Sequence, residues 1–192
     1  MMWLTPSPEL YPIAENVKIV MHDIEFEDYD YNIYTSKRGF PTDGVSMPTF
    51  CELLWDKFEP QIIRSIIQHD VQYILHDFDF SFIQTRKEVD ARFLRSLRCE
   101  NWPYAKLWYV NVRMFGQYIW SKQCDHVDAI NWWQAVKQGE ETIDEWISKI
   151  IEQPDRLEMV KYSKQIQADN RRLLRSIYYD TLGLAQWILK PI

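Results

Sequence analysis

Hydrophobic and polar residues alternate along much of the first 45 positions, which is the period of β-strands. The alternation is clearest over Val17–Met21 and Ile24–Glu27, and Tyr29–Tyr34 is aromatic and β-prone. Acidic residues are concentrated at 23–30, a pattern typical of the solvated face of an edge strand. We therefore expect a small antiparallel β-sheet or hairpin in this part of the chain.

From Pro48 onward the apolar residues follow the spacing of amphipathic helices. Pro48 suits a first helical position, and Thr85 with Glu88 has the sequence of a capping box. The expected helices span Thr49–Trp55, about Pro60–His76, Thr85 to about Arg98, and a segment that begins near Pro103 and carries Leu107 and Val112.

The last third of the chain also has a helical pattern. Two short helices are separated near Gly139, the second with a capping box at Thr142–Glu145, and Pro154 opens a longer helix that reaches about Tyr179. The fold class we predict is α+β, mainly α: an N-terminal β-sheet or hairpin, a helical core and a C-terminal helical appendage. The expected division is a core domain at 1–122 and an extension at 123–192.

Composition narrows the function classes. Apolar residues make up 46% of the 192 residues, which is enough for a core, and the net charge of −6 argues against a nucleic-acid binder. The chain shows neither an apolar run that could cross a bilayer nor the pattern of a signal peptide. Nine tryptophans fit either a helical core or a surface that docks on a partner.

The strongest chemical signal is His69-Asp70-Val71-Gln72-Tyr73 followed by Asp90. On a helix His69 and Tyr73 lie one turn apart, and Asp70 points about 100° around the axis. Asp90 belongs to the next helix, and antiparallel packing would bring its carboxylate to the imidazole. His69 could then act as a general base, with Asp90 fixing its tautomer and Tyr73 in support.

A cation could complete such a site. Asp70 offers a carboxylate, and the turn-rich loop Gly39–Pro48 adds the carboxylate of Asp43 and the carbonyl of Gly44. Calcium accepts mixed carboxylate and carbonyl ligands and would stabilise the oxyanion of an ester under attack.

The same residues also have a structural interpretation. Buried His–Asp pairs often join helices as hydrogen-bonded staples, and Tyr73 could be a further partner. Asp43 and Gly44 are then a tight turn, with Ser46 capping the helix that follows. The sequence leaves both interpretations open.

The motifs in this order resemble an uncharacterised family of bacteriophage and prophage proteins. The resemblance covers about residues 10–120 and implies a phage origin without an assigned activity. The matching motifs are Gly39-Phe40-x-Thr42-Asp43-Gly44-x-Ser46-x-Pro48, His69-Asp70-x-x-Tyr73, Arg86-x-x-x-Asp90-x-x-Phe93, and the segment from Trp108 to Gly116 and on to Trp120.

A looser resemblance is to secretory and parvoviral phospholipases, which share a calcium loop, a His-Asp-x-x-Tyr helix and a later Asp. It implies His69 as the base, Asp70 as the calcium ligand, Tyr73 as a support and Asp90 as the acid of the dyad. The Gly-rich calcium loop of those enzymes is replaced here by Thr42–Ser46, and their disulfides are absent.

Two functions follow as hypotheses. The first is a phage-encoded hydrolase, with calcium as a candidate cofactor, that acts on a phospholipid-like ester during breach of the host envelope. The second is a non-enzymatic virion protein of the tail, baseplate or capsid. It would bind other virion proteins or itself through a Trp-rich surface and the C-terminal helices. Either would place the protein in the virion or the host cytoplasm.

Overall fold

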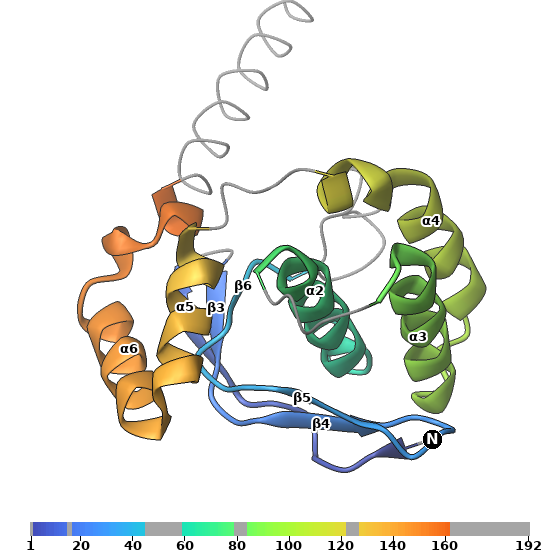
Figure 1. Cartoon of the computed structure of the whole chain (residues 1–192), viewed down its shortest axis with the longest axis horizontal. Helices are drawn as coiled ribbons and strands as arrows, with labels where there is room; N and C mark the ends of the chain where they lie inside the picture. Colours follow the sequence, from blue (N-terminus) through green and yellow to red (C-terminus); the bar gives the residue numbers. More distant parts are fainter. Residues whose placement is uncertain (1, 15–16, 45–58, 79–83, 122–126, 162–192) are drawn as a thin grey trace, which may run out of the picture.

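Short antiparallel strands come first in the structure and helices follow (Figure 1). The computed structural model describes residues 2–14, 17–44, 59–78, 84–121 and 127–161, so the expected helix at 49–55 lies outside it. The strands are β1 (Met2–Trp3), β2 (Leu10–Ala14), β3 (Val17–Val20), β4 (Ile24–Glu27), β5 (Ile33–Ser36) and β6 (Pro41–Thr42). The helices are α2 (Ile63–Phe78), α3 (Arg86–Cys99), α4 (Ala105–Ser121), α5 (Val127–Gln138), α6 (Glu140–Glu152) and the 3-10 helix η1 (Pro154–Arg156).

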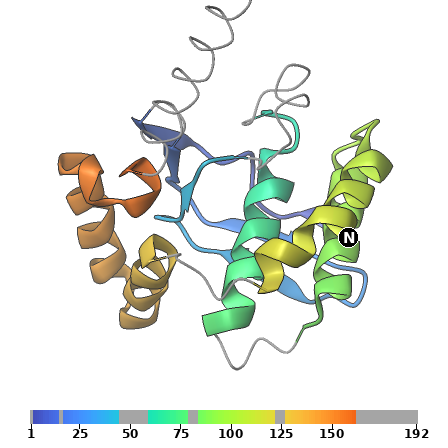
Figure 2. The ribbon, with the colours of Figure 1, turned by 90° about the horizontal axis from the view of Figure 1, so that it is seen from above.

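The predicted fold class is confirmed: the chain is α+β and mainly α, with N-terminal antiparallel sheets ahead of the helices. One three-stranded sheet has the order β1-β4-β5, and the other has the order β2-β3-β6. Figures 1 and 2 both place α2 in the middle of the molecule, with α3 and α4 on one side of it and α5 and α6 on the other.

The expectation that the acidic stretch follows an edge strand was wrong. β4 is the central strand of its sheet, because Met2 and Trp3 pair with it from the far N-terminal end of the chain. The side chain of Asp28 points inward and is buried, and it accepts hydrogen bonds from the backbone N–H groups of Asp30 and Asn32. A long-range strand pairing of this kind leaves no local signal in the sequence.

Helix α2 matches the prediction within a few residues. Its apolar positions Ile63, Ile66 and Ile67 are all buried. The capping box of α3 is present, since the Thr85 hydroxyl accepts from the Glu88 N–H and the Glu88 carboxylate accepts from the Thr85 N–H. Helix α3 ends where Asn101 adopts a φ of 54°, a left-handed conformation that Asn tolerates better than most residues.

The predicted start of the second C-terminal helix was wrong. Helix α6 begins at Glu140, so Thr142 lies inside its first turn and does not cap it. Gly139 precedes the helix with a φ of 115°, which permits the sharp reversal after α5. The longer helix does not open at Pro154 either, because Pro154–Arg156 forms the 3-10 turn η1 and helical structure resumes at 158.

A side chain from a distant element caps that resumed helix. The Asp128 carboxylate on α5 accepts hydrogen bonds from the N–H groups of Glu158 (3.1 Å) and Met159 (2.8 Å). An Asp at a helix N-terminus normally caps from the adjacent residue. Here the cap comes from about thirty residues upstream and ties η1 and its continuation to α5.

The tryptophans whose side chains the structure describes favour the interpretation as core residues, and the docking surface stays a prediction. Six of the nine tryptophans have described side chains, and each of the six is buried or packed against a core cluster: Trp3, Trp102, Trp108, Trp132, Trp133 and Trp146. The exposed aromatic residues are tyrosines instead, including Tyr29 and Tyr31 in the β4–β5 turn.

The C-terminal helices α5 and α6 contact the N-terminal third of the chain. The indole N–H groups of Trp132 and Trp146 donate to the carbonyls of Arg38 (2.9 Å) and Gly39 (2.8 Å), and the Trp132 ring packs edge-on against Phe40. The division at residue 122 stays a prediction. Among the described residues no helix is both long and apolar enough to cross a membrane.

Candidate functional site

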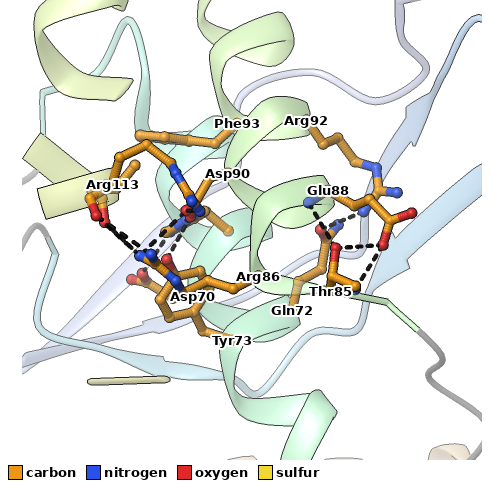
Figure 3. A network of polar contacts seen from close by, with 12 residues as sticks. Asp70, Gln72, Tyr73, Thr85, Arg86, Glu88, Asp90, Arg92, Phe93 and Arg113 are labelled. Atoms are coloured by element: carbon orange, nitrogen blue, oxygen red, sulfur yellow. Dashed lines mark hydrogen bonds and ion pairs between the residues drawn. The ribbon is translucent and has the colours of Figure 1, made fainter. Parts of the chain in front are cut away.

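The candidate site lies where α2, α3 and α4 meet (Figure 3). Helix α2 supplies His69, Asp70 and Tyr73, and α3 supplies Asp90. The expected contact is present: His69 Nε2 lies 3.1 Å from Asp90 Oδ1, and the Tyr73 hydroxyl donates to the same oxygen. Because a carboxylate can only accept, His69 carries its proton on Nε2 in this contact.

Asp90 is the centre of the cluster. It has no solvent exposure, and its second oxygen lies 2.6 Å from Arg113 Nη1 and 3.5 Å from Arg86 Nη1. Burial raises the pKa of Asp90, but hydrogen bonds from His69, Tyr73 and Arg113 outweigh burial and leave the pKa below its usual range. Asp90 is therefore a carboxylate at neutral pH.

The imidazole of His69 is enclosed on its two faces. Its ring centroid lies 4.2 Å from that of Tyr73 and 4.5 Å from that of Phe93, and the residue is 7% exposed. The second nitrogen, Nδ1, is 3.7 Å from Asp70 Oδ1, which is beyond the length of a good hydrogen bond. The Asp70 side chain is 37% exposed, so the Nδ1 side is the one that approaches solvent.

Two carboxylates change the protonation of His69. Burial lowers its pKa, but the two nearby carboxylates, Asp70 at 3.7 Å and Asp90 in a hydrogen bond, outweigh burial and raise the pKa above its ordinary value. The imidazole therefore keeps its second proton to a higher pH than an exposed histidine does. It becomes a base only above that pKa.

The calcium site expected at Asp70, Asp43 and Gly44 stays a prediction, and its residues come from two separate elements. Asp43 and Gly44 directly follow β6, and Gly44 has a φ of 75° with its N–H donating to the Thr42 hydroxyl at 3.0 Å. This is the tight turn expected for the pair. Among the described residues no group of three His, Cys, Asp or Glu side chains is arranged to hold a metal ion. Ser46 lies outside the described residues.

Two arginines of the cluster were not assigned a role from the sequence. Arg86 stands four residues before Asp90, a spacing that brings side chains together on a helix, so a local signal existed. Arg86 also donates to the carbonyls of Val112 and Arg113, which fixes α4 against α3. Arg113 had no such signal, because it lies on another helix.

The arrangement can bind and move a proton. A buried carboxylate orients the imidazole through Nε2, and the Nδ1 side faces a carboxylate at the edge of the cluster. Such a pair can take a proton from water on Nδ1, with Asp90 stabilising the imidazolium that results. The same contacts also join three helices, as a staple would.

The comparisons with known proteins show a partial similarity to one family and no activity. Residues 19–112, just under half of the chain, match the model of a family described as "Protein of unknown function (DUF1353)". The match includes His69, Asp70, Tyr73 and Asp90 and ends one residue before Arg113. No curated protein and no solved structure matches the chain. Most of the candidate site therefore lies within a region similar to a family of unknown function.

Proposed function

We propose that the protein is a phage-encoded hydrolase that uses His69 as its acid–base residue on an ester such as a phospholipid during breach of the host envelope. One observation carries the proposal. Asp90 holds Nε2 of the imidazole, and Nδ1 is 3.7 Å from the partly exposed Asp70, too far for a strong hydrogen bond. The imidazole thus has one anchored nitrogen and one that a water molecule could engage.

In the proposed reaction Nδ1 of neutral His69 takes a proton from water, and the oxygen of that water attacks the ester carbonyl carbon. The imidazolium is stabilised by Asp90 while the tetrahedral intermediate exists. The intermediate collapses by breaking the bond to the alcohol oxygen, which receives the proton from Nδ1. The products are an acid and an alcohol, and His69 returns to its neutral form.

Calcium belongs to the proposal as the cation for Asp70, Asp43 and the Gly44 carbonyl, where it would stabilise the oxyanion. No step of the acid–base sequence above runs through a metal. Calcium titration of the hydrolysis rate, with a chelator as the zero point, tests this part separately. If the rate does not change with calcium, the calcium part of the proposal is refuted, and the role of His69 is unaffected.

The experiment is hydrolysis of phospholipid vesicles and of a soluble chromogenic ester by the full chain. We expect His69→Gln to lower the rate by about 10²–10⁴-fold, whereas His22→Gln, at an exposed histidine, leaves it unchanged. Circular dichroism of each variant separates lost chemistry from lost fold. Absence of hydrolysis on every ester, or a rate that His69→Gln does not alter, refutes the proposal.

The pH profile adds a readout that a purely structural role would not change. Since the base is neutral His69, the rate should rise with pH through the raised pKa of that residue. Asp70→Asn removes one of the two carboxylates that raise this pKa, so the rising limb should move to lower pH.

The second candidate is a non-enzymatic virion protein in which the cluster is a staple. The observation that favours it is the complete burial of Asp90 among four side chains from three helices. In this case His69→Gln lowers stability and changes no activity. Binding to other virion proteins or to a second copy would be measured by sedimentation and by incorporation into particles.

A further inference from the structure

A second polar cluster lies beside the site, between α2, α3 and β5, and it contains a buried cation (Figure 3). Arg92 on α3 is 5% exposed. Its Nη1 donates to the side-chain oxygens of Gln72 (2.6 Å) and Gln84 (2.5 Å), and its Nη2 donates to the Tyr34 hydroxyl (2.9 Å). All three acceptors are neutral.

Within the described part of the chain, no carboxylate lies at ion-pair distance from Arg92. The two described carboxylates whose charges act on Arg92, Asp28 and Glu88, make their hydrogen bonds to other groups. Asp28 accepts from the Tyr34 hydroxyl and from the N–H groups of the β4–β5 turn, and Glu88 is exposed and holds the Thr85 cap. A buried guanidinium without an anion is costly, because buried charges are normally paired.

The same place holds donors that lack an acceptor. Arg92 Nε and the amide nitrogen of Gln72 are buried and make no hydrogen bond to any described residue, and the same is true of Nε of Arg95, one turn further along α3. Burial lowers the pKa of Arg92, and together with the charge of Arg95 it outweighs Tyr34 and Asp28, which raise that pKa. Two cations and an orphan amide N–H are thus gathered where, among the described residues, no carboxylate contacts either guanidinium directly.

We propose that this cluster is a binding site for a small oxyanion, a phosphate or carboxylate group held by Arg92, Arg95 and the amide of Gln72. The oxyanion would supply a negative charge in direct contact with the guanidinium groups and several acceptor oxygens at once. Gln84 and Arg95 are only partly buried, so the ligand would enter from their side. The site is independent of His69 and of the proposed hydrolysis.

The test is thermal unfolding of the full chain in inorganic phosphate, in acetate and in chloride at equal ionic strength. We expect saturating phosphate or acetate to raise the Tm of the wild type by about 4 °C or more above that in chloride. Phosphate alone, acetate alone or both raising the Tm identifies the ligand class. Equal Tm in all three salts overturns the proposal.

A single substitution can supply the missing charge from within the protein. Gln72→Glu places a carboxylate on Arg92 Nη1, so the Tm in chloride should rise and the response to the oxyanion should disappear. Gln134→Glu adds the same charge at an exposed position of α5 and should keep the wild-type response. A lower Tm for Gln72→Glu together with an intact response contradicts the site.

Gln84→Glu is a second variant that keeps the proposal testable if Gln72→Glu does not fold. Its carboxylate would reach the same Nη1 from a partly exposed position. It should also raise the Tm in chloride and reduce the response to the oxyanion, and failure of both effects counts against the proposal.

Discussion

Single residues decide the geometry of the candidate site, and Asp90 decides most of it. Its buried carboxylate contacts an imidazole, a phenol and two guanidinium groups that come from α2, α3 and α4. Any function of His69 depends on this residue, because Asp90 fixes both the tautomer and the orientation of the ring.

Asp90→Asn should be strongly destabilising. It removes the negative charge that pairs with Arg86, Arg113 and His69, so buried or half-buried cations lose their counter-charge. We expect a loss of about 3–5 kcal/mol in the free energy of unfolding, measured by urea denaturation. Asp30→Asn, at an exposed position of the β4–β5 turn, is the control, and an equal effect of the two substitutions would contradict the role of Asp90.

Glu100 makes stability depend on pH. Burial raises its pKa from an ordinary value of 4.5 to about 7, despite hydrogen bonds from Ser65 and Arg64. Between these two values the folded protein holds a proton that the unfolded chain has lost, so folding becomes less favourable as the pH rises.

The stability of the wild type relative to Glu100→Gln should therefore fall by roughly 2–3 kcal/mol between pH 5 and pH 8. Urea denaturation at a series of pH values measures it. Glu141→Gln changes an exposed glutamate of α6 and serves as the control. A difference between wild type and Glu100→Gln that stays constant with pH would show that Glu100 does not titrate in this window.

At the level of elements, the connection from β5 to β6 anchors the C-terminal helices. Gly39 has a φ of 83°, and a Cβ built on it would lie 3.1 Å from Trp146 and 3.3 Å from Ile147. Its carbonyl accepts the Trp146 indole N–H. Arg38, the preceding residue, pairs with Asp144 and Glu140 on α6. Glycine is needed here for both its backbone conformation and its size.

Gly39→Ala should cost about 2–4 kcal/mol, the sum of backbone strain and overpacking against α6. Gly139→Ala is the matched comparison, because its φ is 115° but nothing lies within 4 Å of the added Cβ. It should cost only the strain, about 1–2 kcal/mol. Denaturant unfolding of both variants measures the difference. Equal losses in the free energy of unfolding would mean that crowding against Trp146 does not affect stability.

For the whole molecule, β3 and the C-terminal helices connect two hydrophobic core clusters. Val20 belongs to the cluster that includes α2 and Trp132, and Val17 and Ile19 belong to the one that includes Ile143 of α6. The two faces of one short strand thus pack against helices that lie far apart in the sequence.

Truncation after residue 122 should therefore destabilise the remainder. Removal of α5 and α6 uncovers Val17, Ile19 and Phe40, all of which are buried in the full chain. We expect a lower Tm and binding of a hydrophobic dye by residues 1–122, measured by calorimetry and fluorescence. An unchanged Tm would support an independent core domain at 1–122.

Local patterns in the sequence were enough to predict part of the candidate site. His69 and Tyr73 share a helix face because they are four residues apart, and Asp90 lies on the next helix along the chain, where antiparallel packing was expected to bring it to the imidazole. Arg113 could not be placed, because which residue of α4 meets Asp90 depends on the packing of α4 on α3. The cluster around Arg92 could not be predicted for the same reason, because its residues meet only through the packing of separate elements.

The sequence by itself determined the fold class, the apolar face of α2 and the cap of α3, since each depends on the period or chemistry of neighbouring residues. Only the tertiary structure decided that β4 is a central strand, that Asp128 caps a helix from a distant element and that the described tryptophans lie in the core. Those features depend on which distant segments meet. Chain topology and side-chain packing set that choice, and neither leaves a periodic signal.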